Sequence, residues 1–189
     1  MGSSTSKVLD KNEIDTIIAD TGFNPRQINR LYTRFLHLDK NKCGFLKRED
    51  FIFIPELAIN PLGDKVVNEF FKSTENDELN FHQFVRTLAR FRKVSPNQST
   101  EFNDKESKLN FLFGMYDFNN DGKIDITEML NMLQMMVGSN IKMEQVNHIG
   151  ERTMAEADLD NDGYVSYQEF VKAFENVDIE EKMSIKFLE

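Results

Sequence analysis

One twelve-residue pattern occurs twice in the second half of this sequence, at residues 117–128 and 158–169. Both copies carry acidic or amide side chains at positions 1, 3 and 5, glycine at position 6, a branched apolar residue at position 8 and glutamate at position 12. The alternating polar positions direct oxygens toward one point, and glycine allows the sharp turn that brings them there. The chain is therefore constrained to form two tight, oxygen-lined loops.

These two segments have the spacing of EF-hand calcium loops. Ca²⁺ is a hard cation that takes roughly 6–8 oxygen ligands at about 2.3–2.6 Å, and a short loop can supply them. We predict one ion in each loop. The first loop offers the side chains of Asp117, Asn119 and Asp121, the carbonyl of Lys123, a water on Asp125 and both carboxylate oxygens of Glu128. The second offers Asp158, Asp160, Asp162, Tyr164, Ser166 and Glu169 at the same positions.

The flanking sequence tests this interpretation, because an acidic segment with a glycine is usually an ordinary solvated turn. An EF-hand needs a helix on each side of its loop. Apolar residues recur at helical spacing on both sides of both segments. They are Leu109, Leu112, Phe113 and Tyr116; Met129, Leu130, Leu133, Met136 and Val137; Val146, Ile149, Thr153, Met154 and Ala157; and Phe170, Val171 and Phe174. These sets predict four amphipathic helices.

The first half contains two further segments that align with the pattern but have lost ligands. In loop 39–50, Cys43 replaces the oxygen at position 5, and Asp50 at position 12 is one methylene shorter than glutamate. In loop 72–83, Lys72 stands at position 1 and Gln83 at position 12. Too little negative charge remains there to dehydrate Ca²⁺, so we predict that loop 72–83 is metal-free. The residues leave open whether loop 39–50 retains weak metal binding.

The helices around these degenerate loops are still recognisable, since Asn24 and Pro25 form a helix start and apolar residues follow at helical spacing. We predict an all-α fold of the EF-hand superfamily, with four helix-loop-helix units in two lobes and short antiparallel bridges between paired loops. The predicted parts are an N-terminal segment with a lipidation site (1–22), an N-lobe with two degenerate EF-hands (23–91), a mobile linker (92–106), a C-lobe with two calcium-binding EF-hands (107–178) and a C-terminal tail (179–189).

Composition excludes several functional classes. The net charge of −9 is unfavourable for nucleic acid, whose phosphates need basic surfaces. The three histidines and the single cysteine are scattered and match no catalytic motif, so we predict no enzymatic activity. No stretch is long and apolar enough to cross a membrane. One cysteine and no secretory signal favour the reducing cytoplasm.

An acidic EF-hand protein is expected to bind a basic amphipathic helix in an apolar groove. Six methionines lie in the calcium-binding half, and methionine adapts to such grooves, although core packing is the commoner role of any single one. They are Met129, Met132, Met135, Met136, Met143 and Met154. We further expect the alternating Met183, Ile185 and Phe187 at the edge of the groove.

The first six residues match the pattern for N-myristoylation of Gly2 after removal of Met1. Chance can produce so short a motif, and expression tags begin with the same letters, but no histidine run follows. A single acyl chain binds membranes only marginally, so a second contact is needed. Lys7 and Lys11 are too few to provide it, and we expect a membrane-embedded partner protein instead.

Several short runs resemble the calcineurin B homologous proteins, relatives of the regulatory B subunit of calcineurin. The similarity extends from Gly2 to Leu188 and includes DTGF at 20–23, RLY at 30–32, IPELAINPLGD at 54–64, RTLA at 86–89, MMVG at 135–138 and KMSIKFL at 182–188. The first and last runs resemble the homologous proteins more than calcineurin B itself, whereas residues 55–57 and 60–62 fit both.

This resemblance implies an obligatory cofactor of plasma-membrane Na⁺/H⁺ exchangers that binds a juxtamembrane cytoplasmic helix, with roles in trafficking and in restraining calcineurin. It also implies that only the last two EF-hands bind calcium and that Gly2 is myristoylated. Residues 132–141 and 180–188 are similar to the family's nuclear export signals. The linker is shorter and more polar than the family's, which argues against a function carried by the linker.

We therefore expect a calcium-binding regulatory protein whose two lobes clasp an amphipathic helix of a membrane partner, a Na⁺/H⁺ exchanger, and support its activity, pH regulation and trafficking. We expect it in the cytoplasm, peripheral at the plasma membrane and endomembranes, and shuttling through the nucleus. Two alternatives stay open. One is a regulatory subunit of a protein phosphatase, as calcineurin B is, and the other is a calcium buffer, which would gain nothing from two ligand-poor loops. The sequence gives neither the calcium affinity nor whether calcium acts as a switch.

Overall fold

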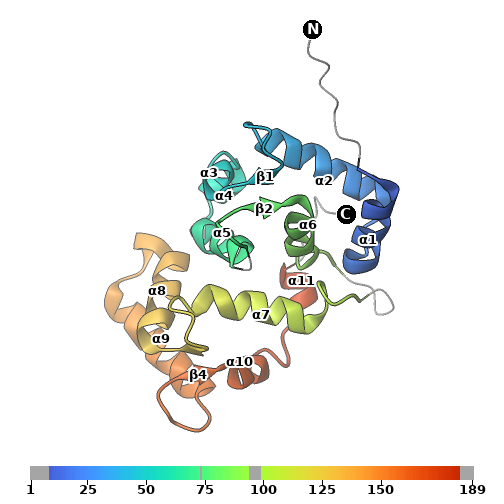
Figure 1. Ribbon diagram of the computed structural model, residues 1–189. Coiled ribbons are helices and arrows are strands. Elements are labelled where there is room, and N and C mark those ends of the chain that lie inside the picture. The colour runs from blue at the N-terminus through green and yellow to red at the C-terminus, as the bar shows by residue number, and fades with distance from the viewer. Residues whose placement is uncertain (1–8, 73, 94–98, 184–189) are drawn as a thin grey trace.

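The computed structural model describes residues 9–72, 74–93 and 99–183, and these ranges form the predicted all-α EF-hand fold. Two groups of helices are stacked in Figure 1, and each group contains two helix-loop-helix units. Within the described residues, no helix has both the length and the apolar character needed to cross a membrane.

The N-lobe contains one helix that precedes its two EF-hand units. That helix is α1 (Lys11–Thr21). The first unit comprises α2 (Pro25–Leu38), β1 (Phe45–Leu46) and α3 (Arg48–Phe51), and α4 (Pro55–Ala58) follows it. The second unit comprises α5 (Gly63–Phe71), β2 (Leu79–Asn80) and α6 (Phe81–Ala89). β1 and β2 pair antiparallel, with Leu46 opposite Leu79.

The C-lobe repeats this plan with longer helices. Its first unit comprises α7 (Lys105–Tyr116), β3 (Lys123–Ile124) and α8 (Ile126–Val137), followed by the 3₁₀ turn η1 (Gly138–Asn140). The second comprises α9 (Met143–Ala157), β4 (Val165–Ser166) and α10 (Tyr167–Ala173), and α11 (Ile179–Met183) ends the described chain. β3 and β4 pair antiparallel, with Ile124 opposite Val165. The predicted bridges between paired loops are therefore confirmed.

Local sequence explains where the first EF-hand helices begin and end. The Asn24 side chain accepts the Gln27 N–H at 2.9 Å, the Gln27 side chain accepts the Asn24 N–H at 2.9 Å, and Pro25 takes the first helical position. The exit helix is short, because Pro55 disfavours helical geometry in the residue before it. The chain instead turns and starts α4 at that proline.

An aromatic cluster forms the centre of the N-lobe core. The ring of Phe51 lies 5.3 Å from that of Phe70, and Phe35 lies 5.7 Å from Phe84, all measured between centroids. Tilted and edge-on rings at these separations add specific attraction to the area they bury. Apolar packing therefore holds the two ligand-poor units together.

Helix α1, which the sequence analysis did not anticipate, covers one side of this core. Ile17 is buried and α1 packs against α6. The Asp20 carboxylate accepts the Arg86 Nε–H at 2.9 Å. The segment interpreted as a lipidated N-terminus thus contributes its second half to the N-lobe.

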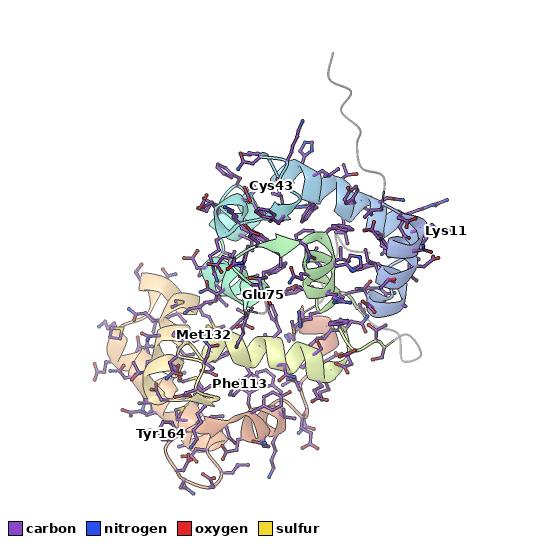
Figure 2. The ribbon with its side chains drawn as sticks, in the orientation of Figure 1. Lys11, Cys43, Glu75, Phe113, Met132 and Tyr164 are labelled. Atoms are coloured by element: carbon purple, nitrogen blue, oxygen red, sulfur yellow. The ribbon has the colours of Figure 1, made fainter. Side chains whose placement is uncertain are left out.

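Helix α7 lies between the two lobes. Phe113 faces the C-lobe core, with its ring centroid 5.4 Å from that of Phe170, whereas Phe111 lies 5.1 Å from Phe91 of the chain leaving the N-lobe. Figure 2 shows Phe113 and Met132 inside the C-lobe. The prediction that α7 is amphipathic is wrong, because the N-lobe covers the side that would otherwise face solvent.

The described ends of the predicted linker are packed between the lobes. Asn103 is completely buried and donates its side-chain N–H to the Thr21 carbonyl at 3.2 Å. Lys108, 1% exposed, donates to the Arg92 carbonyl at 3.0 Å. These contacts differ from the solvated linker expected from composition, because the polar side chains bond buried carbonyls instead of water. Residues 94–98 lie outside the described part.

The C-terminal tail begins as a helix of the C-lobe core. Ile179 and Met183 of α11 are buried, and α11 packs against α7. Met183 therefore belongs to the C-lobe interior and not to a groove edge. Ile185 and Phe187 lie outside the described residues.

Candidate metal centre

The aspartate at position 1 closes the turn of each C-lobe loop. The Asp117 carboxylate accepts the N–H groups of Asp121 at 3.1 Å and Gly122 at 3.0 Å. Asp158 accepts the N–H groups at the same two positions of its loop at 3.2 and 2.9 Å. Gly122 and Gly163 have φ of 83° and 87°, the left-handed conformation that the motif predicts. The two loops therefore share one backbone geometry.

The glutamate at position 12 reaches across each loop from its far end. One Glu128 oxygen accepts the N–H groups of positions 2 and 3 at 2.8 and 3.2 Å, and the other accepts that of position 9 at 3.0 Å. Glu169 makes the same three bonds at 2.7, 3.3 and 2.8 Å. The N–H and hydroxyl of Ser166 and the N–H of Leu159 lower the pKa of Glu169 to about 2. Its carboxylate is thus ionised and able to bind a cation at neutral pH.

The remaining side-chain ligands of loop 158–169 converge at the centre of that loop. One carboxylate oxygen from each of Asp158, Asp160 and Asp162 lies within 4.8 Å of the others. Oxygens bound to one Ca²⁺ at about 2.3–2.6 Å lie at most about 5 Å apart, so this set fits the ion. In the first loop the Asn119 side-chain oxygen accepts the Asp121 N–H at 2.8 Å, as Asp160 accepts that of Asp162 at 3.1 Å. The donor sets of both loops therefore suit calcium.

An ion pair joins the two loops. The Lys123 ammonium donates to an Asp162 oxygen at 2.8 Å and lies 4.7 Å from the centroid of the Tyr164 ring. The hydrogen bond between them raises the pKa of Lys123 and lowers that of Asp162. The motif assigned Lys123 only a backbone carbonyl ligand, because position 7 has no side-chain requirement. Its side chain instead contacts a predicted ligand of the neighbouring loop.

Loop 39–50 keeps the bonds that the position-1 carboxylate makes in the C-lobe loops, but it lacks some of those made by position 12. Asp39 is buried and accepts the N–H groups of Cys43 at 3.0 Å and Gly44 at 2.8 Å, as position 1 does in the C-lobe. Asp50 accepts the Lys47 N–H at 2.8 Å, which corresponds to position 9. The Asp50 side chain is shorter than glutamate and makes no described bond to positions 2 and 3. The loop therefore lacks the bonds by which position 12 connects its two ends in the C-lobe.

Loop 72–83 is held by a protein cation. Arg48 of α3 donates to Asp77 at 3.0 Å and to Asn68 at 2.6 Å. Gln83 caps α6 by exchanging hydrogen bonds with Asn80 at 2.9 Å each. Arg48 thus supplies positive charge from a neighbouring helix. That loop 72–83 binds no metal stays a prediction.

Comparison with known proteins places these loops in a family. The model of an EF-hand domain pair matches residues 106–175. The chain is 37% identical to the calcineurin B subunit of Naegleria gruberi, over 98% of this chain and 99% of the relative. It is 36% identical to the type 1 calcineurin B subunit of Dictyostelium discoideum over the full length of both chains, and 38% identical to the type 2 protein over 99% of this chain and 98% of the relative.

These matches establish the protein's family and leave its narrower subfamily open. An EF-hand pair indicates calcium binding, and its relatives mark the chain as a regulatory protein and not an enzyme. The narrower resemblance to calcineurin B homologous proteins stays a prediction. From its paired EF-hand loops and its full-length similarity to calcineurin B subunits, the chain belongs to the calcineurin B family.

Proposed function

We propose that this protein is a calcium-binding regulatory subunit of a protein phosphatase of the calcineurin kind. The observation that carries the proposal is the full-length similarity to calcineurin B subunits of several organisms. It favours the phosphatase alternative over the Na⁺/H⁺ exchanger that was our first expectation. The exchanger now rests only on the resemblance of the terminal runs.

We further propose that calcium acts in the C-lobe alone, with one ion in each of its loops. Support comes from the buried position-12 glutamates Glu128 and Glu169 and from the converging aspartates of loop 158–169. Asp50 and Gln83, at position 12 of the N-lobe loops, make only capping bonds. The N-lobe then acts as a metal-independent platform for the partner.

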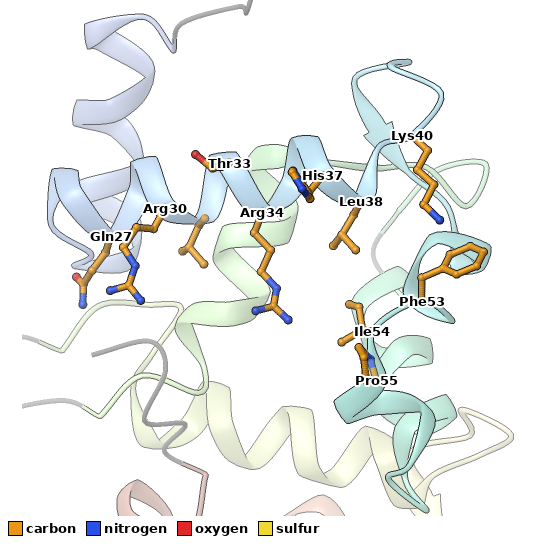
Figure 3. A pocket seen from close by; sticks show the side chains of 11 residues that line it. Gln27, Arg30, Thr33, Arg34, His37, Leu38, Lys40, Phe53, Ile54 and Pro55 are labelled. Carbon is orange, nitrogen blue, oxygen red and sulfur yellow. The ribbon is translucent and has the colours of Figure 1, made fainter.

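A groove on the N-lobe offers a surface for a partner helix. It has a volume of about 750 Å³ and lies between α2 and residues 53–55, as Figure 3 shows. Leu31, Leu38 and Ile54 give it apolar lining, and Phe53, 62% exposed, stands at its rim. Apolar grooves of this kind bind one face of an amphipathic helix.

The charge of this groove favours a different partner from the basic helix that the net charge led us to expect. Arg30, Arg34 and His37 of α2 line it together with Lys40 from the loop that follows, as Figure 3 shows. The Lys40 ammonium lies 3.4 Å from the centroid of the Phe53 ring, at the rim. Although the whole chain has a net charge of −9, the groove is lined by cations and, among the residues that the structure describes, by no acidic side chain. A helix with acidic residues along its edges complements this groove better than a basic one.

Binding to two helical peptides tests the proposed partner. One peptide is the helix of a calcineurin catalytic chain that binds the regulatory chain, and the other is a juxtamembrane helix of a Na⁺/H⁺ exchanger. We expect the first to bind more tightly in calorimetry. The charge reversals R30E and K40E together should weaken it about tenfold, since each exposed ion pair contributes up to about 1 kcal/mol.

The double variant K142E and K172E provides a matched control, because it makes the same charge change on exposed C-lobe positions. Its affinity for the phosphatase peptide should stay close to that of the unaltered protein. Tighter binding of the exchanger peptide would reject the phosphatase assignment. Equal losses in both double variants would reject the N-lobe groove as the binding surface.

We propose in addition that Gly2 is myristoylated and that a fraction of the protein is held at membranes from the cytoplasm. Gly2 lies outside the described residues. Replacing it with alanine removes the acylation site, so the membrane-bound fraction should fall several-fold in cell fractionation, since one acyl chain gives only marginal binding. The variant S4A keeps the motif and should behave as unaltered protein. Equal membrane recovery of G2A and S4A would contradict acylation.

A further inference from the structure

Helix α5 of the N-lobe packs directly on α7, the helix that leads into loop 117–128 (Figure 1). At this contact the Glu69 carboxylate, 11% exposed, lies against Gly114. A Cβ atom at Gly114 would come within 2.6 Å of both carboxylate oxygens. Any larger residue at Gly114 would displace the Glu69 side chain, so glycine allows this N-lobe carboxylate to approach the last turn before the calcium loop.

Charges of both signs surround Glu69. Burial raises its pKa most, the cations Lys72 and Arg90 lower it, and the charge of Asp117 raises it. Its ion-pair partner, Lys72, lies at 3.4 Å on its own chain segment and is 44% exposed. Arg90, also charged, is held to α7 by a 3.1 Å bond from its Nε to the Ser107 hydroxyl. Glu69 and Asp117, the first predicted calcium ligand, line the same cavity at this contact, so their charges interact.

A second N-lobe charge touches the loop itself. The Lys65 ammonium lies 3.2 Å from the centroid of the Phe118 ring. Phe118 occupies position 2, and its N–H donates to Glu128. Burial lowers the pKa of Lys65, and the negative charge of Glu128 acts in the opposite direction. Helix α5 therefore contacts the start of loop 117–128, whereas Figure 2 shows Tyr164 of the other loop at the far end of the C-lobe.

We propose that Ca²⁺ in loop 117–128 tightens the packing of α5 on α7, so that the N-lobe responds to this ion and not directly to the one in loop 158–169. The inference rests on the proposed calcium sites. Without the ion, Asp117 repels Glu69 across the lobe contact. A bound Ca²⁺ cancels part of the loop's negative charge and so reduces this repulsion, while it also weakens the attraction of Lys65 to the loop. The effect on Glu69 outweighs that on Lys65 because the Glu69 side chain is only 11% exposed and its charge is little screened by water.

Hydrogen exchange of the α5 amides measures this coupling. In the full chain, saturating Ca²⁺ should slow exchange in residues 63–71 about tenfold relative to a chelator, a coupling within the usual range for linked sites. The effect should persist in E169Q, provided that loop 117–128 is still filled, and disappear in E128Q. An effect lost in E169Q while calorimetry shows its loop 117–128 filled, or absent from the unaltered protein with that loop filled, would overturn the proposal.

Linkage requires the converse effect on affinity. The variant E69Q should weaken calcium binding to loop 117–128 about three- to tenfold and leave loop 158–169 unchanged. The variant E151Q removes the same charge from an exposed position on α9 and should change neither site. Equal affinities for E69Q and E151Q would overturn the coupling. Failure of the unaltered protein to bind Ca²⁺ at all would instead reject the proposed calcium sites, so the two failures are distinguishable.

Discussion

Replacing Glu128 and Glu169 together with glutamine is expected to abolish calcium binding at micromolar concentrations. Position 12 is the ligand that donates two charged oxygens, and glutamine offers one neutral oxygen in nearly the same volume. The N–H groups that now bond each carboxylate would remain in place, so the loop should keep its shape and lose its affinity. Both sites should become weaker than roughly 10⁻⁵ M, the weak end of the range for intracellular sensors.

Calorimetric titration measures this loss directly. The double variant E151Q and E156Q removes the same charges from exposed positions on α9 and should retain both sites. The melting temperature gives a second readout, since an ion that binds only the folded state raises it. That rise should be absent from the E128Q and E169Q variant. Two tight sites remaining in that variant would contradict the ligand assignment.

Replacing Phe35 with alanine is expected to destabilise the N-lobe by about 3–5 kcal/mol, even with calcium in excess. Phe35 is 2% exposed, and its ring lies 5.4 Å from that of Phe81 and 5.7 Å from that of Phe84. Domains are stable by only about 5–15 kcal/mol, so the loss is a large share of the total. The N-lobe has no predicted metal to offset it.

Denaturant unfolding followed with an N-lobe probe checks this prediction. Cys43 is the chain's one cysteine and is exposed, so it can carry the label. The variant L36A changes the neighbouring residue of α2, which is 43% exposed, and should cost less than about 1 kcal/mol. If F35A and L36A unfold at the same denaturant concentration, the aromatic core does not hold this lobe together.

The sequence predicted the parts of this fold that local spacing determines. Ligand spacing located the loops, and the positions of Ile124 and Val165 located one bridge between them. The start of α2 followed from Asn24 and Pro25, because a cap and a proline act within one helical turn.

Contacts between distant segments could not be predicted in this way. Helical periodicity shows that a side chain is buried but not what covers it, so α7 was expected to have a solvent face. Asn103 looked like a linker residue, because its partner, the Thr21 carbonyl, is remote in sequence. The approach of Glu69 to Gly114 and the reach of Lys123 to Asp162 depend on packing of the lobes and loops, which no motif contains.

The bond from Arg48 to Asp77 helps to hold the N-lobe when the calcium concentration is low. Loop 72–83 has a protein cation beside it, supplied by the neighbouring helix α3, before any ion binds. On our proposal of a metal-independent N-lobe, the surface for the partner would be formed at any calcium concentration. A complex formed on the N-lobe would then persist while the proposed C-lobe sites empty and refill, and calcium would act on an assembly that has already formed.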